Sequence, residues 1–321
     1  MNTSNKNLIT KNVTKSLINK IAIRAFLLFL STSSLISCKK NEAVAYKPTA
    51  QALSNLFNIS LNNIKQTATF DAATTFTFTS AQGTTITIDG TCLRKNGNPV
   101  TGNVELEFVE LYDRASMAMT NKPTIGINAS NEEEVLESGG EFYLNVTQNG
   151  VSLTTTCYIP IEVPTAITGG TKTGMQPFNG TTDANGKLTW EVAPASDFYV
   201  KTNPDKYASV LPAFGWFNCD RFYNDPRPKT HITVLVPAGY ANASTVFLST
   251  NAVPNSLGGI GGSKYPVGLD CNIIFVTEEN GNFRYAIKPM TLVADQHVTF
   301  SISETRLATA AQFKAALNAL P

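Results

Sequence analysis

From Phe70 onward, apolar and polar residues alternate, and this period of two constrains the fold more than any other feature of the chain. The alternating residues form short runs: Phe76 and Phe78; Ile86 and Ile88; Val104, Leu106 and Phe108; Phe142, Leu144 and Val146; Ile159, Ile161 and Val163. Such runs are typical of strands with one face on a core. Asn-Gly pairs at 96–97, 149–150 and 185–186 supply residues that tolerate the positive φ of hairpin turns. The sequence therefore predicts a β-sandwich.

A one-residue change of phase interrupts this pattern. After Phe108 the next apolar residues are Val109 and Leu111, which occupy the opposite face of the same strand. We interpret the change as a β-bulge or the end of the strand.

The whole chain is predicted to be mainly β, with two β-sandwich-like domains after a signal peptide and a short C-terminal helix. The expected segments are 1–37, signal peptide; 38–65, tether and short helical segment; 66–166, first sandwich; 167–228, an irregular connection rich in Gly and Pro with one hairpin around 181–192; and 229–321, second β-domain with the helix. Ser303 is the expected helix cap. The expected apolar face of the helix comprises Leu307, Ala310, Phe313, Leu317 and Leu320.

The N-terminal segment has the layout of a secretory signal. Residues 1–37 carry five basic residues and no acidic one, and end in the apolar run AFLLFLSTSSLIS before Cys38. Leu35-Ile36-Ser37-Cys38 resembles the bacterial lipobox. The resemblance implies cleavage before Cys38, a diacylglycerol on its thiol and an acyl chain on its new amino group. An ordinary signal with a chance cysteine, or a retained membrane helix, are the alternatives.

The residues after Cys38 indicate the membrane. Lys39 is not the aspartate that retains lipoproteins in the inner membrane of many Gram-negative bacteria, so we expect the outer membrane, on either its periplasmic side or the cell surface. Several acyl chains together give a stable anchor.

A second resemblance covers roughly residues 66–165. LRKNGNPVTGNVELEFVELYDRASMAMTNKPT, LESGGEFYLNVTQNG and IPIEVP are similar to the ZU5-like β-sandwich modules of Bacteroidota lipoproteins, and GWFNCDRFY at 215–223 is similar to the region C-terminal to that module in the same lipoproteins. This resemblance implies a fold and a bacterial group. It implies no reaction, because the family has none generally assigned.

Charge and motifs argue against several classes of function. Beyond residue 37 the chain has 20 basic and 24 acidic residues, so it lacks the basic surplus of a nucleic-acid binder. The only histidines are His231 and His297, and neither HExxH, GxSxG nor a P-loop is present. LGGIGGS at 257–263 is interpreted as a loop. We therefore predict a non-enzymatic protein without a cofactor.

The remaining polar residues suggest weaker hypotheses. Glu105 and Glu107 share the face opposite the apolar residues and are expected to face solvent. The run 132–134 is acidic and is expected to be solvated, with Ca²⁺ binding as the alternative. The triplets at 231–233 and 297–299 (HIT and HVT) allow His-assisted autoproteolysis. A Cys219–His231 protease pair is a further alternative.

Aromatic residues gather at 212–225, where Trp216, Phe217 and Tyr223 are the candidate ligand-binding residues. Exposed rings of this kind stack on sugars. The alternative is that Trp216, Phe217 and Phe222 fill the junction between the domains, where Asp220 and Arg221 could pair.

Four body cysteines allow three disulfide connectivities, which the sequence leaves open: Cys92, Cys157, Cys219 and Cys271. The leading functional hypothesis is an outer-membrane lipoprotein acting as an envelope binding or structural module, with a protein or glycan partner and no nucleic acid. The first alternative is a glycan-binding accessory lipoprotein of a polysaccharide-uptake system. A hydrolase or an autoproteolytic protein is the second.

Overall fold

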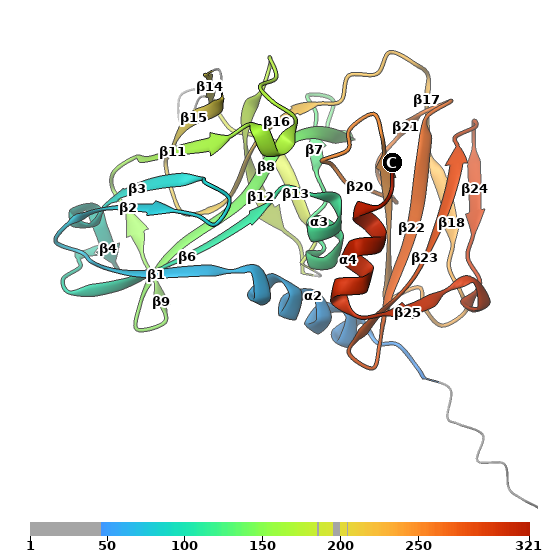
Figure 1. The fold of residues 1–321 in the computed structure, drawn as a ribbon, viewed down its shortest axis with the longest axis horizontal. Helices are drawn as coiled ribbons and strands as arrows, with labels where there is room; N and C mark the ends of the chain where they lie inside the picture. The colour runs from blue at the N-terminus through green and yellow to red at the C-terminus, as the bar shows by residue number, and fades with distance from the viewer. Residues whose placement is uncertain (1–45, 185, 195–199, 204) are drawn as a thin grey trace, which may run out of the picture. The chain divides into compact units, whose positions relative to one another are not determined.

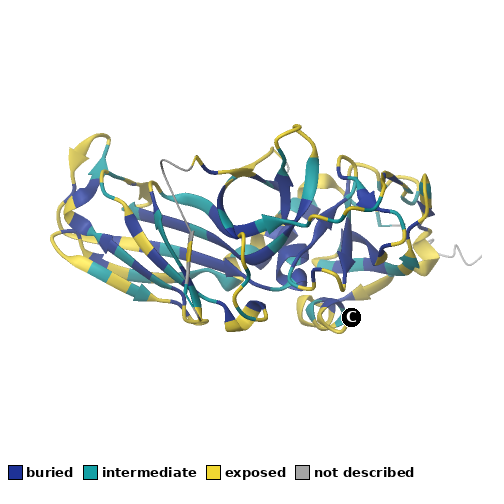
Figure 2. Ribbon diagram, turned by 90° about the horizontal axis from the view of Figure 1, so that it is seen from above, coloured by how far each residue is buried: buried dark blue, intermediate teal, exposed yellow. Residues whose placement is uncertain are grey.

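The computed structural model describes residues 46–184, 186–194, 200–203 and 205–321, and residues 47–321 form one compact unit. The prediction of a mainly β protein with a short C-terminal helix is confirmed. Buried residues lie along the strands, whereas exposed residues gather in the connections (Figure 2). The signal peptide and Cys38 lie outside the described residues.

The first part of the unit is a β-sandwich (Figure 1). Its eight-stranded sheet contains β1 (Gln66–Asp71), β6 (Asn103–Leu111), β8 (Glu133–Gln148), β16 (Gly215–Phe222), β12 (Gln176–Thr182), β13 (Leu188–Val192) and β7 (Ile125–Ile127), with β9 (Val151–Ser152) beside β8. The facing sheet contains β14 (Val200–Thr202), β15 (Lys206–Leu211), β11 (Ile159–Pro164), β3 (Thr85–Asp89) and β2 (Thr75–Thr79). The alternating apolar residues of these strands make one buried cluster.

Smaller elements complete this part. A three-stranded sheet contains β10 (Thr154–Thr155), β4 (Leu93–Lys95) and β5 (Asn98–Pro99), and the 3₁₀ turns are η2 (Gly90–Cys92) and η3 (Ala166–Thr168). Both residues of each Asn-Gly pair at 96–97 and 149–150 have positive φ, as hairpin turns require.

The end of β6, from Phe108 to Leu111, is buried on both faces, which explains the change of phase after Phe108. Its pairing with β8 runs without a shift from Glu105 to Leu111, so the predicted bulge is wrong. Phe108 packs in the sandwich core, whereas Val109 and Leu111 pack in a second cluster together with the helices. A strand covered on both faces loses its polar side and so its alternation.

Residues 167–228 differ from the irregular connection that was expected. They contribute β12, β13 and β16 to the large sheet and β14 and β15 to the facing sheet. Because β7 pairs with both β13 and β8, the strands β8, β16, β12, β13 and β7 close into a ring. Leu136, Phe178, Leu188 and Trp190 form the buried cluster of this ring. Gly180 permits the packing, because a Cβ there would lie 2.6 Å from Trp216 Cβ.

The C-terminal part is built on a second five-stranded sheet. It contains β20 (Gly258–Gly259), β19 (Ser244–Thr250), β22 (Asp270–Glu279), β23 (Asn282–Thr291) and β25 (Arg306–Ala308). Two short pairs flank it: β17 (Lys229–Thr230) with β21 (Tyr265–Pro266), and β18 (Ile232–Leu235) with β24 (Gln296–Thr299), the latter parallel. The turn η4 (Ile302–Glu304) precedes β25.

Three helices lie between the two parts: α2 (Ala50–Ile64), α3 (Arg114–Thr120) and α4 (Ala310–Asn318) (Figure 1). Their buried residues pack in one cluster with side chains of β6, β19, β22 and β23. The expected cap Ser303 is wrong, because Thr309 caps α4 by accepting from the Gln312 backbone N–H. Leu307 is correspondingly an exposed residue of β25.

Candidate functional site

A hollow of about 590 Å³ lies where the ring of strands meets the C-terminal part. Its lining comes from β8, from the segment that enters β12, from the end of β16 and from the loop after β19: Glu137, Thr173, Gly174, Gln176, Arg221, Phe222, Tyr223, Asn224 and Ala252. The volume lies within the range of small-molecule sites. It is the candidate functional site of the described residues.

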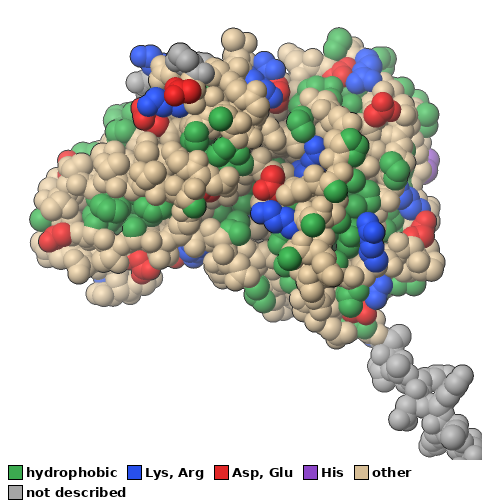
Figure 3. Space-filling view, viewed as in Figure 1, with side chains coloured by type: hydrophobic (Ala, Val, Ile, Leu, Met, Phe, Trp, Pro, Cys, Tyr) green, Lys and Arg blue, Asp and Glu red, His purple; other side chains and the backbone are tan. Residues whose placement is uncertain are grey.

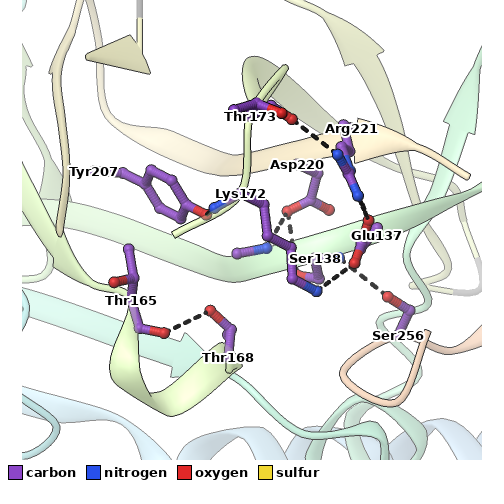
Figure 4. Close-up of polar contacts among 11 residues, drawn as sticks. Glu137, Ser138, Thr165, Thr168, Lys172, Thr173, Tyr207, Asp220, Arg221 and Ser256 are labelled. Atoms are coloured by element: carbon purple, nitrogen blue, oxygen red, sulfur yellow. Dashed lines mark hydrogen bonds and ion pairs between the residues drawn. The ribbon is translucent and has the colours of Figure 1, made fainter. Parts of the chain in front are cut away.

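Three charged side chains form a network at one wall of the hollow (Figure 4). Glu137 Oε2 accepts from Arg221 Nε at 2.6 Å, and Glu137 Oε1 accepts from the ammonium of Lys172. Arg221 also donates to the carbonyl of Thr173 at 2.9 Å. Burial alone would raise the pKa of Glu137, but the bonds to Lys172 and Arg221 lower it below its ordinary value. Glu137 is thus held as a carboxylate between two cations.

Beneath this network lies a buried carboxylate, Asp220. Its Oδ1 accepts from Ser138 Oγ and from the backbone N–H of Gly139, both at 3.1 Å, and its Oδ2 accepts from Asn218 Nδ2 at 2.9 Å. The suggested pairing of Asp220 with Arg221 is wrong. Neighbouring strand residues point to opposite faces, so Arg221 reaches Glu137 while Asp220 points inward.

A second buried carboxyl group, that of Glu141, lies further along β8. Its Oε1 accepts from Trp190 Nε1 at 3.2 Å, and burial raises its pKa well above the ordinary value. The sequence did not lead us to expect that the acidic residues Glu137, Glu141 and Asp220 lie near one another. The one indication in the sequence was that each of them stands within a strand rich in apolar residues.

The three predicted aromatic residues do not share one surface. Phe217 is buried in the sandwich core and stacks on Phe142 at 5.2 Å between centroids. Trp216, its neighbour on the strand, points to the opposite face, where it packs against Trp190 and Tyr143. Of the three, only Tyr223 lines the hollow. The alternative of aromatic packing at the junction fits Trp216, which packs against the helix cluster, but not Phe217, which lies inside the sandwich. Phe222 packs against Phe178 of the ring.

The alternative of a Cys219–His231 protease pair does not fit the surroundings of the two side chains. His231 and His297 are both exposed, and His297 pairs with Thr233 across the parallel strands β18 and β24. Cys219 is buried in the sandwich core, where burial raises the pKa of its thiol well above the ordinary value. A protonated, buried thiol and an exposed imidazole do not make a nucleophile and its base.

The acidic run 132–134 is bound by lysines from other segments. Glu132 pairs with Lys264, Glu133 with Lys187 and Glu134 with Lys229. On the face that Figure 3 shows, Lys and Arg side chains are likewise scattered and often lie beside acidic ones.

Other predicted polar residues have structural partners. Glu105 is exposed, whereas Glu107 is half-buried and paired with Lys65 at 2.9 Å.

The described residues contain one set of close metal-ligand types, Asp89 with Cys92 and Cys157. The two sulfurs of that set form a disulfide, so they are not available as thiolate ligands. Cys219 and Cys271 are free and buried.

Comparisons with known proteins find no protein-family model and no curated protein that matches the chain. Among the described residues, no helix combines the length and the apolar character needed to cross a membrane.

Proposed function

We propose that the protein is a non-enzymatic lipoprotein of the outer membrane, held by lipid on Cys38, whose β-rich body is a binding or structural module of the envelope. The sequence Leu35-Ile36-Ser37-Cys38 after an apolar run carries this proposal. The folded unit begins with α2, whose cap is Thr49. Residues 38–49 therefore connect the lipid to the body, and twelve residues reach at most about 40 Å.

Two features of the body support the proposal. The disulfide between Cys92 and Cys157 suits an oxidising compartment outside the cytoplasm. The buried carboxylates Glu110 and Asp220 bond to groups of their own β-sandwich, as expected of structural residues.

The anchor is tested by changing Cys38 to Ala in the full chain. We expect the unchanged protein to incorporate labelled palmitate and to sediment with membranes, and the Cys38→Ala variant to do neither, because the thiol that carries the lipid is gone. Cys271→Ala is the control, since it removes a thiol of the body and should leave labelling intact. Palmitate labelling and membrane partitioning of Cys38→Ala would refute the anchor.

Glycan binding at the hollow is the second candidate function. The rings of Phe222 and Tyr223 line it, and so do the amides of Gln176 and Asn224. Aromatic rings stack on pyranose faces, and amides both donate to and accept from hydroxyl groups. This combination favours a neutral saccharide as the ligand.

A glycan microarray, followed by calorimetry with the best saccharide, tests this candidate. Tyr223→Ala should weaken binding about tenfold through loss of the stacking ring. Tyr158→Ala is the matched control, because Tyr158 is 59% exposed and does not line the hollow. Equal affinities of the two variants, or an array without any bound glycan, would count against the hollow and leave the lipid anchor unaffected.

A further inference from the structure

One carboxyl oxygen of Glu141 finds no donor among the described residues. The side chain is fully buried, and Oε1 accepts the bond from Trp190, but Oε2 has no hydrogen-bond partner in that part of the chain. A buried carboxylate oxygen without a partner is costly, because it has lost its hydration and gained nothing in return.

The residue opposite Glu141 on the neighbouring strand also has an unsatisfied acceptor oxygen among the described residues. Asn218 pairs with Glu141 across β16 and β8, and its Oδ1 is also buried, with no partner among the residues that the structure describes. Opposite residues of an antiparallel pair have neighbouring side chains. The two unsatisfied oxygens thus belong to side chains on the same face of adjacent strands, and one proton shared between them would satisfy both.

The neighbouring groups decide which carboxyl carries the proton. Burial raises the pKa of Asp220 as well, but two of the three hydrogen bonds that it accepts, from Gly139 and Ser138, oppose this shift. Glu141 accepts only the bond from Trp190, so it is the carboxyl with the free oxygen to hold a proton. Because Asn218 Nδ2 donates to Asp220, Asn218 Oδ1 is the atom that can accept a hydrogen bond from Glu141.

We propose that Glu141 is a neutral carboxylic acid in the folded protein at neutral pH, and that its Oε2–H donates to Asn218 Oδ1. The inference does not depend on the lipid anchor or on glycan binding. It places one proton at a buried site between β8 and β16, beside Trp190 of β13.

The charged groups around Glu141 come from two segments. Asp220 on β16 repels a second negative charge and so raises the pKa of Glu141 further. Lys122, which lies just after α3, acts in the opposite direction, but its Nζ donates to the carbonyl of Gly186 at 2.6 Å and lies 5.5 Å from the centre of the Trp216 ring. On β6 the residue paired with Glu141 is Leu111.

This proton makes folding depend on pH. The pKa of Glu141 is higher in the folded than in the unfolded chain, so its contribution to stability is complete below about pH 4.5 and is lost as pH rises toward the folded pKa. Within that window the folded state binds one more proton than the unfolded state. The folding equilibrium constant should therefore fall about tenfold per pH unit relative to a variant without the acid.

Glu141→Gln in the full chain is the direct test. The new amide can donate to Asn218 Oδ1 and accept from Trp190, so we expect the variant to fold. The folding equilibrium constants of the variant and of the unchanged protein are measured by urea denaturation at several pH values. The ratio of the first to the second should rise about tenfold for each pH unit above about 4.5. The infrared C=O band of a protonated carboxyl, present at neutral pH, should be lost.

Two variants serve as controls. Asp220→Asn should keep the band and lower the folding constant about tenfold, because an amide would replace an acceptor. Glu110→Gln should also keep the band and lower the folding constant. The buried Glu110 accepts four hydrogen bonds, from Gln66, Ser80, Gln82 and Thr84. The assignment is overturned if Asp220→Asn removes the band, if the unchanged protein has none, or if Glu141→Gln shows no pH-dependent gain.

Discussion

Loss of the disulfide between Cys92 and Cys157 is expected to lower the free energy of unfolding by about 4 kcal/mol. The two residues are separated by 65 positions, and a closed loop of that length restricts the unfolded chain by about this amount. The bond joins the end of η2 to the segment before β11, where Thr156 also donates to the carbonyl of Cys92. Urea denaturation of a Cys92→Ser, Cys157→Ser double variant measures the effect.

Two comparisons separate the cross-link from the sulfur atoms. A reductant should destabilise the unchanged protein to a similar extent and should leave the double variant unaffected. Cys271→Ala removes a free buried thiol and should cost only about 1 kcal/mol through lost packing. A double variant within 1 kcal/mol of the unchanged protein would show that the bond contributes little.

Much of the fold could be predicted because its strands have one buried face. Ile86 and Ile88, for example, are completely or almost completely buried, as their spacing indicates. The limits of the prediction have a physical reason too. Val109 is buried on the second face of β6, in a cluster to which α2 and α4 contribute from distant parts of the sequence. The periodicity of apolar residues in one strand does not show which helices will pack on its second face.

The hairpin of β12 and β13 was predicted around its Asn-Gly pair, but the full length of β12 and the strands β14, β15 and β16 were missed for a different reason. Gly180 and Pro177 would normally weaken a strand, yet both lie inside β12. Gly180 is explained by the close approach of Trp216 and Trp190 to its Cα. A requirement for a small residue opposite two indoles becomes visible only when the pairing partners are known.

The candidate site was predictable only in part. Tyr223 could be named from the aromatic segment. Glu137, however, meets Arg221 through the pairing of β8 with β16, and meets Lys172 through the loop before β12. The buried acidic residues were still harder to predict from the sequence. Glu141 comes directly after two glycines in the sequence, and its contact with Trp190 spans 49 positions.

Trp190→Ala is expected to be the most damaging single change in the ring of strands, with a loss of about 5 kcal/mol or more. The indole is completely buried, and truncation of such a side chain costs about 3–5 kcal/mol. Its Nε1–H also donates to Pro123 O and Glu141 Oε1, both at 3.2 Å, and these buried acceptors would lose their donor at a further cost of about 1–3 kcal/mol. A sum of this size approaches the whole stability of an ordinary domain.

The two tryptophans of the chain allow the hydrogen bonds to be separated from the packing. Trp190→Phe keeps most of the ring but removes the donor, and should cost about 2 kcal/mol. Trp216→Phe is the matched control, because Trp216 is only partly buried and its indole N–H has no hydrogen bond among the described residues. Its loss should stay below about 1 kcal/mol. Denaturation curves of the two variants that coincide would mean that the Trp190 donor adds nothing, and the bond to Glu141 would then not stabilise the ring.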